Sequence, residues 1–184
     1  MKTESTAKYV LRLAGTLLAI TAVVAGLLAL VNSITAPRIE AANARKTQEA
    51  ISAVLPGGYD EEITDYTDDT GLVSKVYASE TGYAIEVTPG GFDNTITMMV
   101  GISKEGEVLG ISIISHTETA GLGAVAAAQT SAGTAFRDQF IGVSGSVSVS
   151  KDGGEIDALT GATITSRAVC EGVNAALSCV ENLG

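Results

Sequence analysis

The longest apolar stretch of the sequence lies near its N-terminus. It covers 19 residues, 13–31, without a charged side chain, and it is rich in Leu, Ala, Val and Ile. A helix of this length is about 28 Å long, which is close to the hydrocarbon thickness of a bilayer. A buried helix of a globular domain is the alternative, but such a helix normally keeps a polar face, and this stretch has none. The pattern therefore predicts one membrane-spanning helix at about residues 11–32.

A cleaved signal peptide is the other interpretation of this segment. The apolar core of a signal peptide is about 7–15 residues long, which is shorter than the stretch seen here. The small-residue pattern Ala42-Asn43-Ala44 lies well beyond the apolar stretch, and Pro37 would obstruct a cut after Ala36. We therefore expect the segment to be a retained anchor.

The rest of the chain alternates short apolar stretches with turn residues. Two hairpins are expected, with strands at residues 73–78 and 83–87 and at residues 95–102 and 108–115, and a further strand is expected at residues 143–149. Helical spacing follows Pro37 at residues 38–55 and returns at residues 167–180, with short helices expected within residues 121–140 and a solvated loop or sheet edge at residues 60–70. Consecutive hairpins between helices predict an α+β domain with a mostly antiparallel sheet and flanking helices.

Charge is distributed unevenly along the 184 residues. The net charge is −10, yet residues 1–36 carry +2 and the remaining residues, with 8 basic and 20 acidic side chains, carry −12. Basic residues that precede a span stay in the cytoplasm, so we expect residues 1–36 to form a cytoplasmic N-terminus and an anchor in the cell membrane, in contact with lipid. Residues 37–184 then form a single extracytoplasmic domain. An acidic domain without a basic stripe is not expected to bind nucleic acid.

The residues that usually form metal or hydrolytic sites are scarce. Cys170 and Cys179 lie nine residues apart in one predicted helix, too far apart for a disulfide, and we expect both thiols to be core residues. The chain has a single His and no C-x₂-C pattern, so no metal site is expected. No Ser or Cys nucleophile signature accompanies the His, so no catalytic residue is expected either.

The segment with the most chemical information immediately precedes the C-terminal helix. It reads Asp157-Ala158-Leu159-Thr160-Gly161-Ala162-Thr163-Ile164-Thr165-Ser166. Small residues allow a ligand to approach the backbone, and the N–H groups at a helix start favour a phosphate. The alternative is a capped helix N-terminus in which Thr165 or Ser166 accepts a backbone N–H. On spacing alone, the capped helix is the simpler interpretation.

The same segment resembles the flavinylation motif of the FMN-binding domain family, Asp-x-x-Ser/Thr-Gly-Ala-Thr/Ser, at every defined position. In that family an extracytoplasmic FMN transferase moves the FMN phosphoryl group from FAD onto the last Thr or Ser. The resemblance implies a covalent FMN, joined by a phosphoester to Thr163. It also implies that the neighbouring residues recognise or contact the cofactor, namely Asp157, Leu159, Thr160, Gly161, Ala162 and Thr165.

A second segment, His116-Thr117-Glu118-Thr119-Ala120-Gly121-Leu122-Gly123, is similar to the His-x-Glu-Thr-Pro-Gly-Leu-Gly segment of the G subunits of Rnf (also called Rsx) complexes. Ala120 stands where that family has Pro. The resemblance spans roughly residues 9–182. We expect this loop to contact the FMN through its polar and small residues, His116, Glu118, Thr119, Gly121 and Leu122. For His116 a hydrogen-bonded residue at a strand end is the alternative.

The resemblance implies an electron-relay subunit of a membrane-bound, ion-translocating ferredoxin:NAD oxidoreductase, active only together with multi-span and iron–sulfur or flavin subunits. A flavinylated subunit of a sodium-pumping NADH:quinone reductase, or of an extracellular electron-transfer system, is an alternative. An anchored binding or sensor domain without redox chemistry is an alternative of another class. A single span without ionisable residues provides no ion path, so ion movement is expected in the partner subunits.

Overall fold

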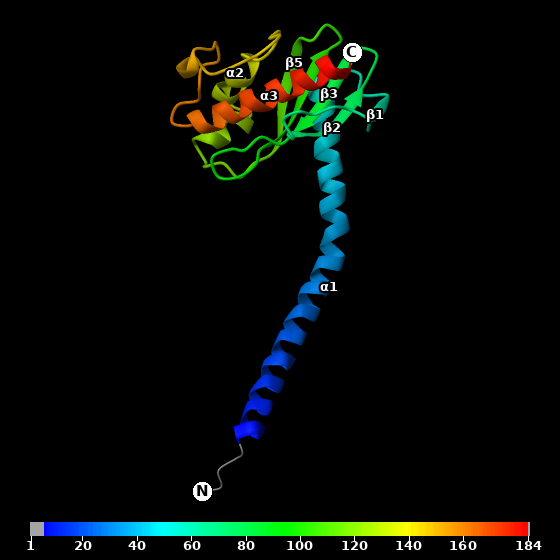
Figure 1. The fold of residues 1–184 in the computed structure, drawn as a ribbon, viewed down its shortest axis with the longest axis vertical. Coiled ribbons are helices and arrows are strands. Elements are labelled where there is room, and N and C mark those ends of the chain that lie inside the picture. The colour runs from blue at the N-terminus through cyan, green and yellow to red at the C-terminus, as the bar shows by residue number, and fades with distance from the viewer. Residues whose placement is uncertain (1–5, 184) are drawn as a thin grey trace. The chain divides into compact units, whose positions relative to one another are not determined.

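The structure, a computed structural model, describes residues 6–183 (Figure 1). Its elements in chain order are α1 (Thr6–Val54), β1 (Glu61–Ile63), β2 (Val73–Ala78), β3 (Gly82–Val87), β4 (Thr97–Ser103), β5 (Val108–Ser115), the 3₁₀ helix η1 (Gly123–Ala127), α2 (Ser131–Asp138), the 3₁₀ helix η2 (Ser150–Asp152) and α3 (Thr163–Leu183). Two compact units result, Met1–Arg45 and Lys46–Gly184. The predicted α+β class is confirmed, whereas the division between residues 36 and 37 stays a prediction.

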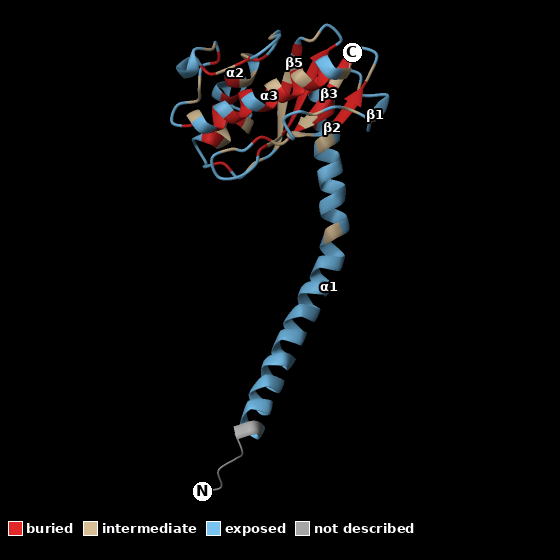
Figure 2. Ribbon diagram, viewed as in Figure 1, coloured by how far each residue is buried: buried red, intermediate tan, exposed pale blue. Residues whose placement is uncertain are grey.

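The first part of α1 is long and apolar enough to cross a membrane. Its large side chains are exposed, Leu17 by 65% and Leu18 by 70%, as Figure 2 shows along most of the helix. The hydroxyls of Thr16 and Thr21 donate to backbone carbonyls one turn earlier, at 2.9 Å in each case. Because a hydrocarbon environment requires polar groups to be satisfied internally, this stretch has the surface that a bilayer favours.

The helix does not stop at Pro37. The helix expected at residues 38–55 is confirmed up to Val54, and α1 runs without interruption from Thr6 through Pro37 to Val54. An internal proline removes one backbone hydrogen bond and costs about 3 kcal/mol. That loss is confined to one turn, and a helix that is propagated from both sides tolerates it.

The sheet has five antiparallel strands in the order β1-β2-β3-β4-β5. The four strands of the predicted hairpins are confirmed, and the predicted acidic edge is the short outer strand β1. Along β4, Met98 and Val100 face one cluster of buried residues, and Met99 faces the other. Both faces of the sheet are therefore covered, which explains why β4 is buried along nearly its whole length.

The end of α1 covers one face of the sheet. Ile51 and Val54 pack there with Met99 and Ala84. The approach is so close that a Cβ placed on Gly101 would lie 2.9 Å from the Cβ of Val54 and would also overlap its backbone carbonyl. A glycine at this position is therefore required for the helix to sit against β4.

Helix α3 covers the other face, and it lies along the sheet in Figure 1. Its apolar side chains recur at helical spacing, and Val169, Val173 and Leu177 are buried against the strands. Cys170 and Cys179 are free and buried in the same cluster, so the prediction that both are core thiols is confirmed. The helix begins four residues before the predicted start at residue 167.

The strand expected at residues 143–149 is wrong. This segment is irregular, and Gly145 has a left-handed φ of 77°. Val147 and Val149 are buried because the segment docks on α3: the Asn174 side chain accepts from the Val147 N–H at 2.7 Å and donates to the Val147 carbonyl at 2.8 Å. One amide side chain thus supplies the two hydrogen bonds that a neighbouring strand would have made.

The contact at Gly101 predicts a specific loss of stability. Gly101→Ala is expected to lower the free energy of unfolding by about 1–3 kcal/mol, because either the helix or the strand must move. The matched control is Gly110→Ala on the paired strand, opposite Gly101, where a Cβ meets nothing within 4 Å. Urea unfolding of the full chain in detergent, followed by tyrosine fluorescence, compares the two. An equal effect of both substitutions would contradict the close packing.

The two thiols are expected to be unreactive in the folded chain. Burial raises the pKa of Cys170 and of Cys179 to about 11, so that only about one thiol in a thousand is ionised at pH 8. A disulfide reagent at pH 8 should label no thiol before unfolding and two per chain afterwards. Rapid labelling of the native chain would show that α3 does not pack as described.

Candidate functional site

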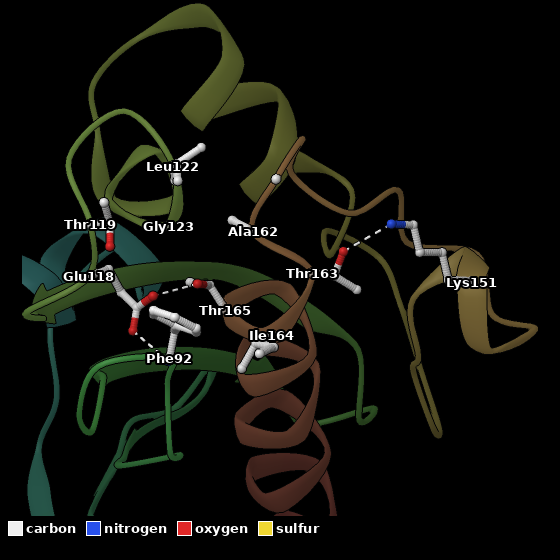
Figure 3. A pocket seen from close by; sticks show the side chains of 11 residues that line it. Phe92, Glu118, Thr119, Leu122, Gly123, Lys151, Ala162, Thr163, Ile164 and Thr165 are labelled. Atoms are coloured by element: carbon white, nitrogen blue, oxygen red, sulfur yellow. Dashed lines mark hydrogen bonds between the residues drawn. The ribbon is translucent and has the colours of Figure 1, made fainter.

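A cavity of about 290 Å³ lies where the start of α3 meets two loops (Figure 3). One loop follows β5 and leads into η1, and the other is the turn at residues 90–94 before β4. The side chains and backbone that line the cavity come from Phe92, Glu118, Thr119, Leu122, Gly123, Lys151, Gly161, Ala162, Thr163, Ile164 and Thr165. Segments far apart in the sequence therefore form a single hollow at one end of α3.

A tight turn presents Thr163 at the first position of α3. The Ala162 N–H donates to the Leu159 carbonyl at 3.0 Å, and Gly161 adopts a left-handed φ of 74° that favours glycine. The buried Ser166 hydroxyl accepts from the Leu159 N–H and donates to the Ala162 carbonyl, both at 3.0 Å. Of Thr165 and Ser166, the two candidate caps, Ser166 therefore holds the turn. The Thr163 side chain takes no part in these hydrogen bonds and lines the cavity.

Glu118 joins the three segments. The residue is only 7% exposed, and its carboxylate accepts from the Phe92 N–H at 2.8 Å and from the Asp93 N–H at 3.4 Å. Its other oxygen accepts from the Thr165 hydroxyl at 2.5 Å, as Figure 3 shows. A buried carboxylate needs such partners, because burial without them costs several kcal/mol.

Two glycines make room for this carboxylate. A Cβ on Gly91 would overlap one Glu118 oxygen, and a Cβ on Gly123 would overlap the other and the Thr165 hydroxyl as well. The buried acid therefore fits beside the cavity only because both positions lack side chains.

The Lys151 ammonium lies beside the Thr163 hydroxyl. Lys151 comes from η2, and its Nζ donates a hydrogen bond to Thr163 Oγ1 at 3.0 Å (Figure 3). Among the described residues that line the cavity, Lys151 is the one with a cationic side chain. Because the domain is strongly acidic, this contact makes the Thr163 position locally favourable for an anion.

The rim of the cavity is apolar. Phe92 is 65% exposed, Ile164 49% and Leu122 43%. These three come from three different segments and surround one hollow. Large apolar side chains gathered in this way typically mark a surface that a ligand or partner covers. The site thus combines a hydroxyl, a cation and an apolar rim.

The first half of the motif lies beside this cavity rather than in it. The Gln139 side chain accepts from the Asp157 N–H at 2.7 Å and donates to the Asp157 carbonyl at 3.3 Å, while the Asp157 side chain is exposed. A second hollow runs along this segment, lined in part by Gly121, Leu122, Asp157, Leu159 and Thr160.

The structure brings most of the predicted site residues together. Seven line the cavity: Glu118, Thr119, Leu122, Gly161, Ala162, Thr163 and Thr165. Four others, Gly121, Asp157, Leu159 and Thr160, line the neighbouring hollow. His116 lines neither of these two sites in the described part of the chain. It is half-buried, and its Nδ1 has no hydrogen-bond partner there.

Sequence reasoning missed Phe92, Lys151 and Ile164. Phe92 follows a Pro-Gly-Gly turn, and an aromatic residue at a loop tip is a weak sign of binding. Lys151 stands 12 residues before Thr163 in a mostly acidic domain, followed by Asp152 and two glycines. The sequence signal that could have identified Lys151 is a lone basic residue next to a turn, shortly before the segment that resembles the flavinylation motif.

Comparison with family models gives two matches. Residues 91–178 match the FMN-binding domain, a range that includes Phe92, Glu118, Lys151 and Thr163. Residues 1–54 match the RnfG N-terminal region, which corresponds to the N-terminal helix up to its last residue, Val54. The match to the RnfG N-terminal region includes the whole of the first compact unit, and the match to the FMN-binding domain lies within the second unit.

Several relatives are similar over most of the chain. One is the G subunit of the Na(+)-translocating ferredoxin:NAD(+) oxidoreductase complex of Acetobacterium woodii, 34% identical over 96% of this chain and 94% of its own length. The G subunit of the ion-translocating oxidoreductase complex of Methanosarcina acetivorans is 31% identical, with 96% and 97% covered. The corresponding protein of Shewanella piezotolerans is 33% identical, with 82% and 80% covered.

The contacts of Glu118 predict that it is needed for the stability of the site. Glu118→Ala removes the acceptor of the buried Thr165 hydroxyl and of the Phe92 and Asp93 N–H groups, and the free energy of unfolding is expected to fall by about 2–4 kcal/mol. Glu105→Ala, on the exposed turn between β4 and β5, is the control and should change it by less than about 0.5 kcal/mol. Urea unfolding measures both, and a Glu118 variant as stable as the control would show that the carboxylate does not join the segments.

Proposed function

The chain belongs to the family of G subunits of ion-translocating oxidoreductase (Rnf) complexes, and on this basis we propose that it carries FMN esterified to Thr163 and relays electrons within such a complex. It is a single-pass membrane protein with an FMN-binding domain. One observation carries the proposal: the Thr163 hydroxyl lies on the cavity and accepts a hydrogen bond from a lysine.

Attachment would use the Thr163 hydroxyl once, during maturation. A bond forms between Thr163 Oγ1 and the phosphorus of the FMN half of FAD, and the bond between that phosphorus and the bridging oxygen breaks. AMP leaves with the bonding electron pair, and the hydroxyl proton passes to a base of the FMN transferase. Because Thr163 is consumed in this step, it is a tether, and no residue of this chain is assigned a catalytic role in turnover.

The residues around the cavity suit FMN. Lys151 would hold the phosphate, and Gly123 lies on the same cavity. Phe92, Leu122 and Ile164 would supply the apolar surface for a flat ring, and covering them removes apolar area from water. Thr119, which lines the same cavity, would contact polar atoms of the ligand.

A covalent link has a physical advantage in an extracytoplasmic domain. A reversible complex empties when the free FMN concentration falls below its dissociation constant, whereas an ester does not depend on that concentration. Bound FMN supplies one- and two-electron transfer, and the protein supplies its position and local field.

The partners follow from the family and from the anchor. The Acetobacterium relative is part of a complex named for ferredoxin, NAD and Na⁺, and we infer the same class of reaction for the complex of this chain. Residues 13–31 hold no ionisable group, so multi-span partners would move the ion, and iron–sulfur or flavin subunits would exchange electrons with the FMN.

The orientation of the chain follows from the charges that flank the anchor. Lys8 and Arg12 precede the span and favour a cytoplasmic N-terminus. The domain that follows would then lie on the extracytoplasmic side, where an FMN transferase would reach Thr163, while lipid surrounds the anchor.

Two substitutions at Thr163 test the tether. After coexpression with an FMN transferase, the wild-type chain should gain the mass of one FMN less water and fluoresce in a denaturing gel. Thr163→Ala should lose both signals completely, because no oxygen remains to form the ester. Thr163→Ser is the matched control and should retain them. An unlabelled wild-type chain would favour an anchored binding domain without redox chemistry, and a labelled Thr163→Ala chain would place the FMN elsewhere.

A further inference from the structure

Two consecutive residues of η2 meet two residues that lie one turn apart on α3. Lys151 Nζ donates to Thr163 Oγ1 at 3.0 Å, and Asp152 accepts from Arg167 Nε and Nη2 at 2.7 Å each. Thr163 and Arg167 are four positions apart, so they share a face of the helix. The two contacts therefore lie side by side and hold η2 against the first turn of α3.

The backbone of η2 is itself fixed. The Ser150 N–H donates to the Ile156 carbonyl at 2.8 Å, and Val149 forms an isolated parallel bridge with Ile156. Gly153 ends η2 in a left-handed conformation, and a Cβ on Gly154 would overlap Ser148. The position of the Lys151 backbone thus depends on the fold and not only on the flexible lysine side chain.

The Asp152–Arg167 pair also leaves Lys151 available to bind at Thr163. Asp152 is the neighbour of Lys151 along the chain, and Arg167 engages both of its carboxylate oxygens in a bidentate geometry. The hydrogen bond from Arg167 holds the pKa of Asp152 below its usual range. The acid next to Lys151 in the sequence is therefore already paired, while Lys151 Nζ donates to the Thr163 hydroxyl.

We propose that Lys151 receives the phosphoryl group at Thr163, first in the transfer reaction and then in the finished ester, and that the Asp152–Arg167 pair positions it. This inference rests on the proposed function. Lys151 donates to the Thr163 oxygen before transfer and to a phosphoryl oxygen afterwards. The bonds formed and broken are those of the attachment step, with AMP leaving and the hydroxyl proton passing to the transferase.

The reason is electrostatic. The attacking oxygen and the phosphoryl oxygens come together in a domain with a large excess of acidic side chains, and Glu118 lies on the same cavity. A fixed cation at the point where negative charge gathers lowers the barrier more than a mobile ion from solution does, because it needs no rearrangement. A solvent-exposed hydrogen bond of this kind contributes little to folding stability.

The test is the initial rate at which a purified FMN transferase, with FAD, labels the full chain in detergent. Lys151→Met should be labelled about 10- to 100-fold more slowly, the usual effect of losing a charge-assisted hydrogen bond. Lys151→Arg should recover part of the rate, because it restores the charge. Lys104→Met is the control, since Lys104 lies over the Tyr83 ring at 4.0 Å, and it should be labelled at the wild-type rate.

A second pair of variants tests the positioning role. Arg167→Met frees the Asp152 carboxylate to compete for Lys151, and labelling should slow. Adding Asp152→Asn to that variant removes the competitor, and the rate should partly recover. Thermal unfolding of every variant identifies any loss that comes from misfolding.

The outcomes separate the two proposals. If the wild-type chain takes no FMN, the proposed function fails, and this inference fails with it. If the wild-type chain is labelled and a folded Lys151→Met chain is labelled at the same rate, the proposed function stands and the role of Lys151 is overturned. If the double variant is no faster than Arg167→Met, the Asp152–Arg167 pair does not act by freeing Lys151.

Discussion

The Glu118 carboxylate accepts hydrogen bonds from the turn before β4 and from the Thr165 hydroxyl, at the point where the loop after β5 crosses the start of α3. Glu118 and Thr165 are 47 residues apart in sequence, and the Phe92 N–H is 26 residues away on the other side. Without this acceptor, the three segments would have no common polar partner at their meeting point. Gly91 and Gly123 are part of the same arrangement, since a side chain at either position would displace the carboxylate.

The scaffold around this junction is rigid for simple reasons of packing. The end of α1 packs on one face of the sheet and α3 on the other, so β4 is buried between two helices. The Gly101 position brings the α1 end into contact with the strand backbone. Because α3 is held along its length, its first turn has a fixed position, and Thr163 at its first residue is fixed with it.

The sequence predicted the parts of the fold that depend on local pattern. The hairpin strands followed from apolar stretches with turn residues between them, and the anchor from one uncharged stretch. The helix expected at residues 38–55 is the last part of α1, which continues through Pro37 because neighbouring turns tolerate one missing hydrogen bond. The strand expected at residues 143–149 was wrong because the segment is held by hydrogen bonds between Val147 and the Asn174 side chain. An alternation of apolar and polar residues does not distinguish such docking from pairing in a sheet. Phe92 and Lys151 were missed because only tertiary structure brings them to the motif.

The Thr163 hydroxyl is held beside a cation and an apolar rim, on a domain that follows a single membrane-spanning helix, in a family of redox complex subunits. Whether this hydroxyl carries the flavin is decided by peptide mass mapping of the complex purified from membranes. We predict one FMN adduct, on Thr163, within a complex that also contains multi-span and iron–sulfur subunits. A peptide containing an unmodified Thr163 in a complex that transfers electrons, or an adduct on another residue, would contradict the assignment of Thr163 as the tether.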